Sequence, residues 1–217
     1  MPKTDTSDIA QALPGSIDGP FLVADPADAN SFLKIDPAKA EISAAGSARP
    51  TKRISLGYVR TAGTSASNTL GTGISCRQVG VGNDGGFYAA LLEVPPDMDV
   101  AEPVSVFLLI APAVNSTMSG GAVRLEVVAG YAKDGQSTPH ITTVEHDQTV
   151  PDSWQANNVE IALVDDGNGR TFAPDIFEAG DIIGLRIRLE RSHAADTFDQ
   201  AVKLGAGAVF EYTAKTL

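Results

Sequence analysis

The sequence predicts an all-β protein, namely an antiparallel β-sandwich of jelly-roll type with an N-terminal extended arm. From about residue 53 onward, apolar residues alternate with polar or small ones, which is typical of strands with one buried and one solvated face. Turn-forming clusters of glycine, aspartate and asparagine separate these segments. No long segment between them has the period of a helix, so we expect eight or nine strands.

The arm spans residues 1–50 in this interpretation, and the sandwich spans residues 51–217. The arm is too short to have a core of its own, and it is interrupted by Pro14, Pro20, Pro26, Pro37 and Pro50. Its two apolar pieces, Phe21–Val23 and Ser31–Ile35, are expected as short strands. Asp36 and Pro37 match a helix N-cap and first-turn proline, which predicts a brief helix over Ala38–Ala45.

A second short helix is predicted in the arm over Thr6–Leu13, where three apolar residues share one helical face. Because such an arm cannot bury its own apolar residues, we expect it to pack against its own body or against a neighbouring subunit.

Within the sandwich, the alternation is clearest in four segments near the middle and end of the chain. Three further segments have the composition of strands, and Arg60–Asn68, rich in small polar residues, is expected to be a loop. The seven strand segments are Arg53–Val59, Ile74–Val81, Val123–Tyr131, Ile141–Val144, Val159–Leu163, Ile183–Leu189 and Val202–Tyr212.

Two other runs, Phe87–Val94 and Val104–Ile110, are apolar almost throughout. Strands that are covered on both faces have this composition, so these two are expected to be covered by the opposite sheet or by a neighbouring subunit. Proline cannot donate to a strand ladder, so Pro95 and Pro96 end the first of these runs.

Charge and composition exclude several functions. The chain has 27 acidic and 16 basic residues, a formal net charge of −11, and no basic stripe, which disfavours nucleic-acid binding. No apolar run approaches the roughly 18 residues of a membrane-spanning helix, so we expect no membrane insertion. The single cysteine, Cys76, excludes an intrachain disulfide and a cysteine-rich zinc site, and is expected to be a small buried hydrophobe.

Three short motifs resemble known sites but fit them poorly, so we expect no cofactor and no metal. Gly80–Gly85 satisfies G-x-G-x-x-G, yet a strand-like run follows it instead of the helix that a dinucleotide site needs. The cluster of His140, Glu145, His146 and Asp147 lies in a polar stretch typical of an edge or loop. Serine, histidine and aspartate all occur, but no serine lies in a G-x-S-x-G elbow, and we expect no catalytic residues and no enzyme activity.

The remaining candidates are ligand contacts. Asp165, Asp166 and Asn168 suggest a calcium loop, but the glycine between them lies at the wrong step, so a polar hairpin tip is preferred and a weak surface cation stays open. Trp154 can serve as a sugar-stacking platform if it is exposed, although a lone tryptophan more often fills the end of a sandwich. Trp154, Tyr131 and the Asp165–Gly169 loop are therefore the candidate contacts for a carbohydrate.

The stretch from about Asp84 to Thr213 resembles the jelly-roll modules of tailed-phage and phage-like (gene transfer agent-like) particle proteins. A strand that ends at Pro96 comes first, followed by the strands Val104–Ala113 and Gly121–Lys133. The most telling part is the end, where a Gly-Asp turn in Ala179–Arg191 leads into a loop containing Asp-Thr, Ala195–Phe198. A final strand then closes with Glu-Tyr at residues 211–212.

The resemblance implies a non-enzymatic structural protein of the virion, made in the host cytoplasm: a head decoration, spike, head fibre or fibre-base protein. It implies a homotrimer that contacts the major capsid or other virion proteins, with the head or tail location left open. Threefold association is compatible with the closed symmetry of most homo-oligomers. The alternative is a carbohydrate-binding or receptor-binding module of a tail or fibre, with a cell-surface glycan as partner, and low aromatic content (6%) counts against it.

Overall fold

The computed structural model describes residues 21–25, 28–36, 41–45, 49–57, 59–60, 66–70, 74–84, 88–132 and 140–215. The chain divides into two compact units, one of residues 1–51 and 213–217 and the other of residues 52–212, and each is described by itself. The described residues include no helix, so none forms a helix that could span a membrane.

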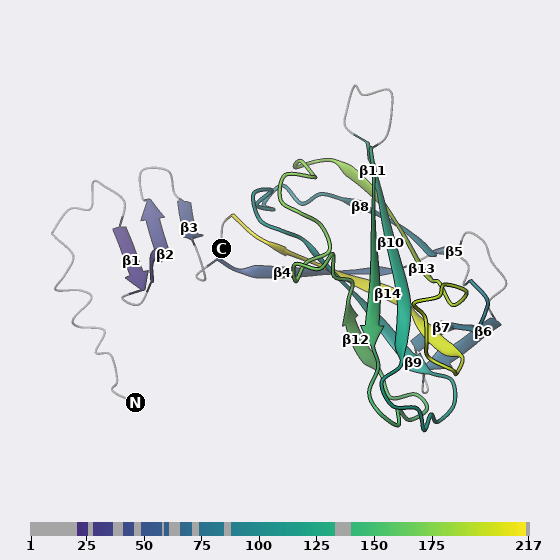
Figure 1. Cartoon of the computed structure of the whole chain (residues 1–217). Helices are drawn as coiled ribbons and strands as arrows, with labels where there is room; N and C mark the ends of the chain where they lie inside the picture. The colour runs from purple at the N-terminus through teal and green to yellow at the C-terminus, as the bar shows by residue number, and fades with distance from the viewer. Residues whose placement is uncertain are drawn as a thin grey trace. The chain divides into compact units, whose positions relative to one another are not determined.

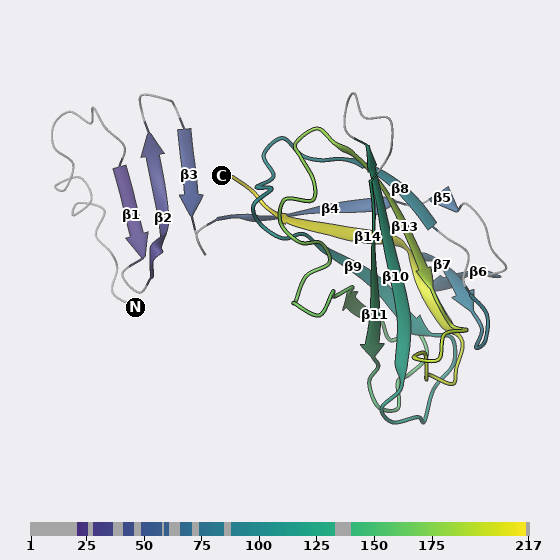
Figure 2. The same ribbon diagram turned by 45° about the horizontal axis from the view of Figure 1, so that its top comes forward.

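The first unit contains a three-stranded antiparallel sheet (Figures 1 and 2). The two strands expected in the arm are confirmed as β1 (Phe21–Asp25) and β2 (Asp28–Asp36), which pair from Phe21 opposite Ile35. The helix expected over Ala38–Ala45 is wrong, because Glu41–Ala45 forms a third strand, β3, paired with β2. Ladder hydrogen bonds to β2 outweigh the weak helical preference of so short a segment. The helix expected over Thr6–Leu13 lies outside the described residues.

The second unit is a β-sandwich of two antiparallel sheets, as the alternating pattern predicted. Its five-stranded sheet has the order β11-β10-β13-β8-β5 (Figure 1). The strands are β5 (Val59–Arg60), β8 (Tyr88–Glu93), β10 (Ala122–Ala132), β11 (His140–Thr149) and β13 (Ile182–Leu189).

The six-stranded sheet has the order β12-β9-β14-β7-β6, and β4 pairs with β14 beside this path. The segment expected as a loop over Arg60–Asn68 is partly a strand, since β6 begins at Ala66 and pairs with β7. The strands are β4 (Thr51–Gly57), β6 (Ala66–Leu70), β7 (Ile74–Val79), β9 (Ser105–Pro112), β12 (Glu160–Leu163) and β14 (Val202–Thr213).

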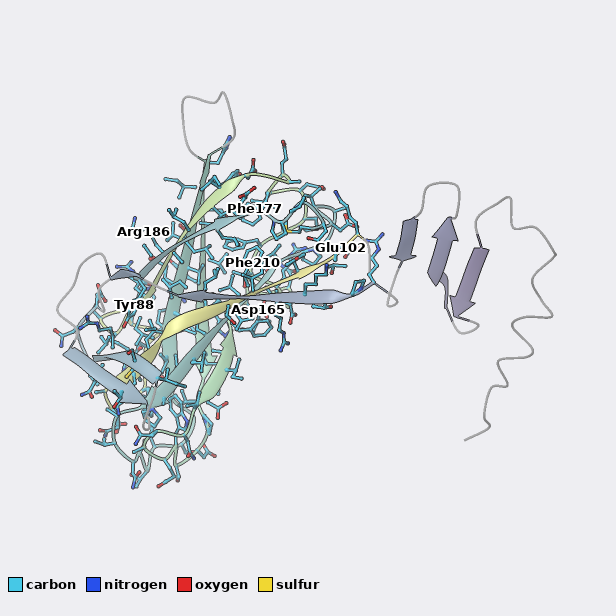
Figure 3. The ribbon with its side chains drawn as sticks, turned by 180° about the vertical axis from the view of Figure 1, so that it is seen from behind. Tyr88, Glu102, Asp165, Phe177, Arg186 and Phe210 are labelled. Atoms are coloured by element: carbon cyan, nitrogen blue, oxygen red, sulfur yellow. The ribbon has the colours of Figure 1, made fainter. Side chains whose placement is uncertain are left out.

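The core lies between the two sheets and consists of the inward-facing member of each alternating pair. Val123, Leu125 and Val127 of β10 are 0% exposed, as are the corresponding apolar residues of β13 and β9. Phe210 of β14 is buried in the same layer (Figure 3). Burial of this apolar surface is the main favourable contribution to folding, at about 25 cal/mol per Å².

The two runs expected to be covered on both faces are each covered on one face by the opposite sheet, and cover of the other face by a neighbouring subunit stays a prediction. Among the described residues, cover of β8 is limited to one face, because Leu91 is 79% exposed while Ala90 and Leu92 are buried. In β9 the outward Phe107 and Leu109 are half-buried. The opposite sheet therefore covers one face of each strand, and no residue in the described part of the chain covers the outer face of β8 at Leu91.

Candidate binding face on the five-stranded sheet

The outer face of the five-stranded sheet carries a row of four residues, one from each of four neighbouring strands. Ile141 of β11 lies opposite Gly130 of β10, which lies opposite Gly184 of β13, which lies opposite Leu91 of β8. Ile141 is 71% exposed and Leu91 is 79% exposed. Two protruding aliphatic side chains thus flank two adjacent positions that have no side chain.

The missing side chains leave a hollow of about 600 Å³ in the sheet surface. The next row of the same face, Val128 beside Arg186 and Ala89, continues its wall (Arg186 is labelled in Figure 3). The described residues that line the hollow are mostly aliphatic or glycine: Gly57, Ala89, Ala90, Leu91, Val128, Gly130, Ile141, Gly184, Leu185 and Arg186.

The fold itself does not require glycine at these two positions. Neither Gly130 nor Gly184 has a φ in the left-handed region. A Cβ on Gly130 would meet nothing within 4 Å, and one on Gly184 would make only ordinary contacts, 3.6 Å from the Gly130 carbonyl oxygen and 3.8 Å from Leu91. Neither the backbone conformation nor internal packing therefore explains glycine at these two positions. Glycine inside a strand also lowers stability, because it loses more conformational entropy on folding than other residues do.

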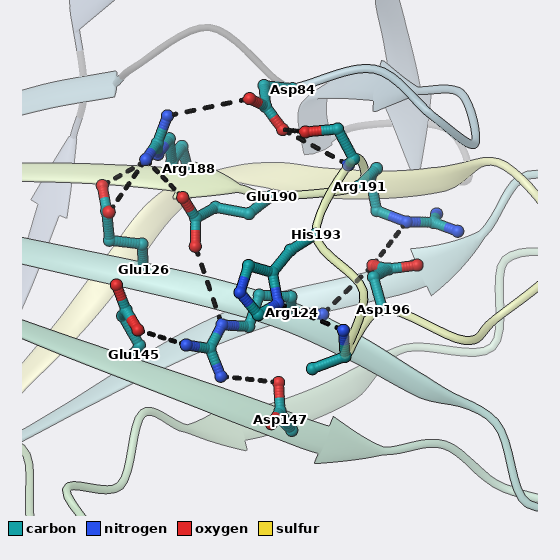
Figure 4. A network of polar contacts seen from close by, with 12 residues as sticks. Asp84, Arg124, Glu126, Glu145, Asp147, Arg188, Glu190, Arg191, His193 and Asp196 are labelled. Carbon is teal, nitrogen blue, oxygen red and sulfur yellow. Dashed lines mark hydrogen bonds and ion pairs between the residues drawn. The ribbon is translucent and has the colours of Figure 1, made fainter.

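Along the same face, the sheet changes from apolar to charged toward the other end of β10. Arg188 donates from Nε and Nη2 to the two carboxylate oxygens of Glu126 at 2.8 and 2.9 Å, a bidentate pair (Figure 4). Arg188 also bonds Glu190 and lies 4.0 Å from Asp84.

Arg124 is the second cation of this cluster. It bonds Glu145, donates to Asp147 at 2.8 Å, and lies 3.6 Å from Glu190 (Figure 4). The cluster therefore joins β10, β11 and β13 through five carboxylates and two guanidinium groups. We call these seven residues the acidic cluster: Asp84, Arg124, Glu126, Glu145, Asp147, Arg188 and Glu190.

The carboxylates of the acidic cluster outnumber its guanidinium groups by three, and Glu190 lies among them. Burial raises the pKa of Glu190, and the charges of Glu126 and Glu145 add to the rise while Arg188 and Arg124 oppose it. One oxygen from each of the three glutamates lies within 4.8 Å of the others, a spacing that a cation can bridge. Each of them already faces an arginine, so the cluster by itself does not identify a metal site.

The structure does not bring the three candidate carbohydrate contacts together. Trp154 is 2% exposed and packs on Phe198 with ring centroids 5.6 Å apart, so its ring faces are not available to a sugar. Tyr131 is half-buried at the opposite end of β10, where it stacks on His140 at 5.0 Å and meets Phe177 edge-on. The tryptophan fills one end of the sandwich, as the more common reading of a lone tryptophan predicted.

The Asp165–Gly169 loop holds its own carboxylates. Asp165 Oδ1 accepts hydrogen bonds from the amides of Gly167 and Gly169 at 2.8 and 2.7 Å. Partial burial acts to raise the pKa of Asp165, but these backbone donors outweigh it and lower the pKa overall. Asp166 accepts from Asn168 and from Arg170, so the carboxylates of this loop are already engaged in hydrogen bonds within it.

The histidine-acid cluster is divided by the alternation of β11. Glu145 and Asp147 face outward to Arg124, whereas His146 lies on the other face, 3.3 Å from Gln148. Cys76 is 3% exposed, and burial raises the pKa of its thiol, so it behaves as the small hydrophobe that was expected.

Sequence reasoning missed both the hollow and the acidic cluster. Gly130 and Gly184 were visible as outward positions of alternating strands, but only the strand register places them side by side. Likewise, Glu126 and Arg188 are 62 residues apart in the chain and become neighbours through the pairing of β10 with β13.

Comparisons with known proteins give only distant likenesses. No protein-family model matches the sequence, and no curated protein matches it. The enzymatically active domain of tailspike protein 4 of bacteriophage CBA120 is 8% identical over 75% of this chain, with a TM-score of 0.33, and this chain spans 19% of its length. The infectious bursal disease virus Gx strain structure is 10% identical over 85% of this chain and 40% of its own, with a TM-score of 0.31.

A third solved structure is the family 11 carbohydrate-binding module from Clostridium thermocellum in complex with a β-1,3-1,4-mixed-linked tetrasaccharide. It is 12% identical over 73% of this chain and 87% of its own, with a TM-score of 0.28. At TM-scores below 0.5 these likenesses carry no argument about function. The assignment of the chain as an antiparallel β-sandwich rests on its own strand pairings.

Proposed function

We propose that the chain is a non-enzymatic structural component of a phage or phage-like particle, a head decoration, spike or fibre-base protein that acts through assembly. The observation that carries the proposal is the hollowed apolar row on the outer face, which none of the described residues covers. Exposed apolar patches of this kind on soluble domains mark sites of protein contact. We place this contact on a phage or phage-like particle because the sequence resembles phage jelly-roll modules.

The Gly-Asp turn and the loop that contains Asp-Thr, which carry this resemblance, both make hydrogen bonds within the sandwich. Asp181 accepts a hydrogen bond from the amide of Glu178 in the Gly-Asp turn, where Gly180 has a φ of 86°. In the loop that follows, Thr197 accepts from the Ala122 amide at 3.0 Å and Asp196 from the Arg124 amide at 3.1 Å, both at the start of β10. These contacts hold the loop that contains Asp-Thr against the start of β10.

The proposal includes a homotrimer that contacts the major capsid protein or another virion protein. Light scattering of the full chain measures the mass directly, and a trimer is the expected result. A monomer at all concentrations would restrict the proposal to a protein that assembles only on the particle.

The proposed function is tested on particles from the cells that encode the chain. Particles are separated on a density gradient, and the chain is detected in the fractions by antibody and on single particles by immunogold electron microscopy. The chain is expected in the particle band at a fixed ratio to the major capsid protein. A chain that stays at the top of the gradient and binds a glycan on an array would instead support the carbohydrate-binding module.

A further inference from the structure

The hollow and the acidic cluster lie on one face and are connected by one strand. Gly130, in the floor of the hollow, and Glu126, in the cluster, are both outward residues of β10. Four residues of strand separate them, which is about 13 Å at 3.3 Å per residue. A single partner segment can therefore reach both features.

The hollow fits an apolar group. Its described lining is aliphatic and glycine except for Arg186, and Leu91 and Ile141 rise on either side of the floor. A large apolar side chain that enters it would be surrounded by the two protruding side chains and the glycine backbone. Buried apolar anchors of this kind contribute most of the binding energy at protein interfaces.

The neighbouring cluster fits a cation. Its five carboxylates exceed its two guanidinium groups by three charges, and three of the carboxylates converge within 4.8 Å. Burial raises the pKa of Glu190, and the charges of Glu126 and Glu145 add to this rise while those of Arg188 and Arg124 oppose it. A second copy of the chain would bring the same excess against it, on a molecule of net charge −11, so charge disfavours self-association through this face.

We propose that this face binds a segment of a different protein, which inserts one large apolar side chain between Leu91 and Ile141 and places a lysine or arginine over the acidic cluster. The two groups are about 13 Å apart, which corresponds to four residues of extended chain or about nine residues of helix. The inference deepens the proposed function, because it states the chemistry of the virion protein that the chain contacts.

The test uses a displayed library of random dodecapeptides selected against the full wild-type chain. Selected peptides are then synthesised, and their affinities are measured for the wild type and for variants. Gly130→Leu fills the hollow, and Leu91→Ser removes one wall at a position exposed enough to leave folding unchanged. Glu145→Gln removes one exposed charge of the cluster. Ile161→Ser and Glu160→Gln are the matched controls, since both lie on β12 of the other sheet and Ile161 is 69% exposed.

The selected peptides are expected to combine a large apolar residue with lysine or arginine at one of the two spacings. Gly130→Leu should weaken their binding at least about tenfold, as loss of an apolar pocket does. Glu145→Gln should weaken it by about two- to fivefold and reduce its dependence on salt, and the control variants should bind as the wild type does.

Peptides without a basic residue, or binding that Gly130→Leu and Leu91→Ser leave unchanged, would overturn the proposal, as would a selection that yields no binder. A concentration-dependent dimer that Gly130→Leu abolishes would show a second copy as the occupant and would also overturn it. Because no particle is used, failure here leaves the gradient experiment on the proposed function intact, and the reverse also holds.

Discussion

Arg191 and Asp196 form an ion pair in which both side chains are fully buried, with Nε and Oδ2 2.7 Å apart. Arg191 also donates to the carbonyl oxygens of Gln200 at 2.8 Å and Phe198 at 2.5 Å, and these hydrogen bonds stabilise the loop that leads into β14. Removal of one partner leaves the other charge buried without compensation.

Asp196→Asn is therefore expected to lower the free energy of unfolding by about 3 kcal/mol, as measured by urea denaturation. Asp199→Asn, at an exposed position of the same loop, serves as control and should change it by less than about 0.5 kcal/mol. Equal effects of the two substitutions would contradict the role given to the buried pair.

Glu190 makes the stability of the chain depend on pH in a defined direction. Because burial raises its pKa in the folded state, its contribution to stability is present below the unfolded pKa and is lost as pH rises through the folded pKa. The stability of the wild type relative to Glu190→Gln should thus be greater at pH 4 than at pH 7 in urea denaturation. The opposite trend would mean that the arginines dominate the surroundings of Glu190.

At this scale the sequence predicted single residues well where local chemistry decides their state. Asp165 accepts hydrogen bonds from backbone amides of its own loop, which short sequence segments can predict. Cys76 and Trp154 are buried, as apolar residues in a chain with a large core are expected to be. The acidic cluster could not be predicted, because its members come from different strands and only their register makes them neighbours.

At the scale of the strand, Gly130 and Gly184 are positions where stability and binding oppose one another. Gly130→Ala and Gly184→Ala should each raise the free energy of unfolding by about 0.5–1 kcal/mol, since a Cβ meets open space or ordinary contacts and reduces the entropy of the unfolded chain. Denaturation curves of the two variants check this. A loss of stability would show that the fold needs glycine there, and the hollow would lose its functional explanation.

Two leucines on neighbouring strands test which face of the sheet is buried. Leu185 of β13 is 0% exposed and Leu91 of β8 is 79% exposed. Leu185→Ala is expected to cost about 2–5 kcal/mol of stability, and Leu91→Ala less than about 0.5 kcal/mol. Similar costs in denaturation experiments would mean that the outer face of β8 is covered within the isolated chain.

The elements were predictable where alternation is strong. Ile183–Leu189 and Val202–Tyr212 alternate over at least seven residues and are the strands β13 and β14. Glu41–Ala45 and Ala66–Leu70 were not expected as strands, because five residues of ordinary composition become strands only through the partner beside them.

At the scale of the whole molecule, the acidic cluster and the net charge of −11 favour a basic partner over a second copy of the chain at this one face, so the contacts of the proposed trimer are expected on other surfaces. The sequence predicted the sandwich because apolar and polar residues alternate along its strands, which places the apolar residues on one buried face. It left open whether the opposite sheet or a neighbouring subunit covers the second face of β8, since an apolar run has the same composition in both cases.

The most direct test of the account is the incorporation of the full chain into particles when the wild type and Gly130→Leu are expressed in the producing cells, with Ile161→Ser as control. The wild type and the control are expected in the particle band at a fixed ratio to the major capsid protein, and Gly130→Leu at the top of the gradient. Wild-type chain absent from the band would contradict the structural role, and Gly130→Leu incorporated like the wild type would contradict the hollow as the docking site.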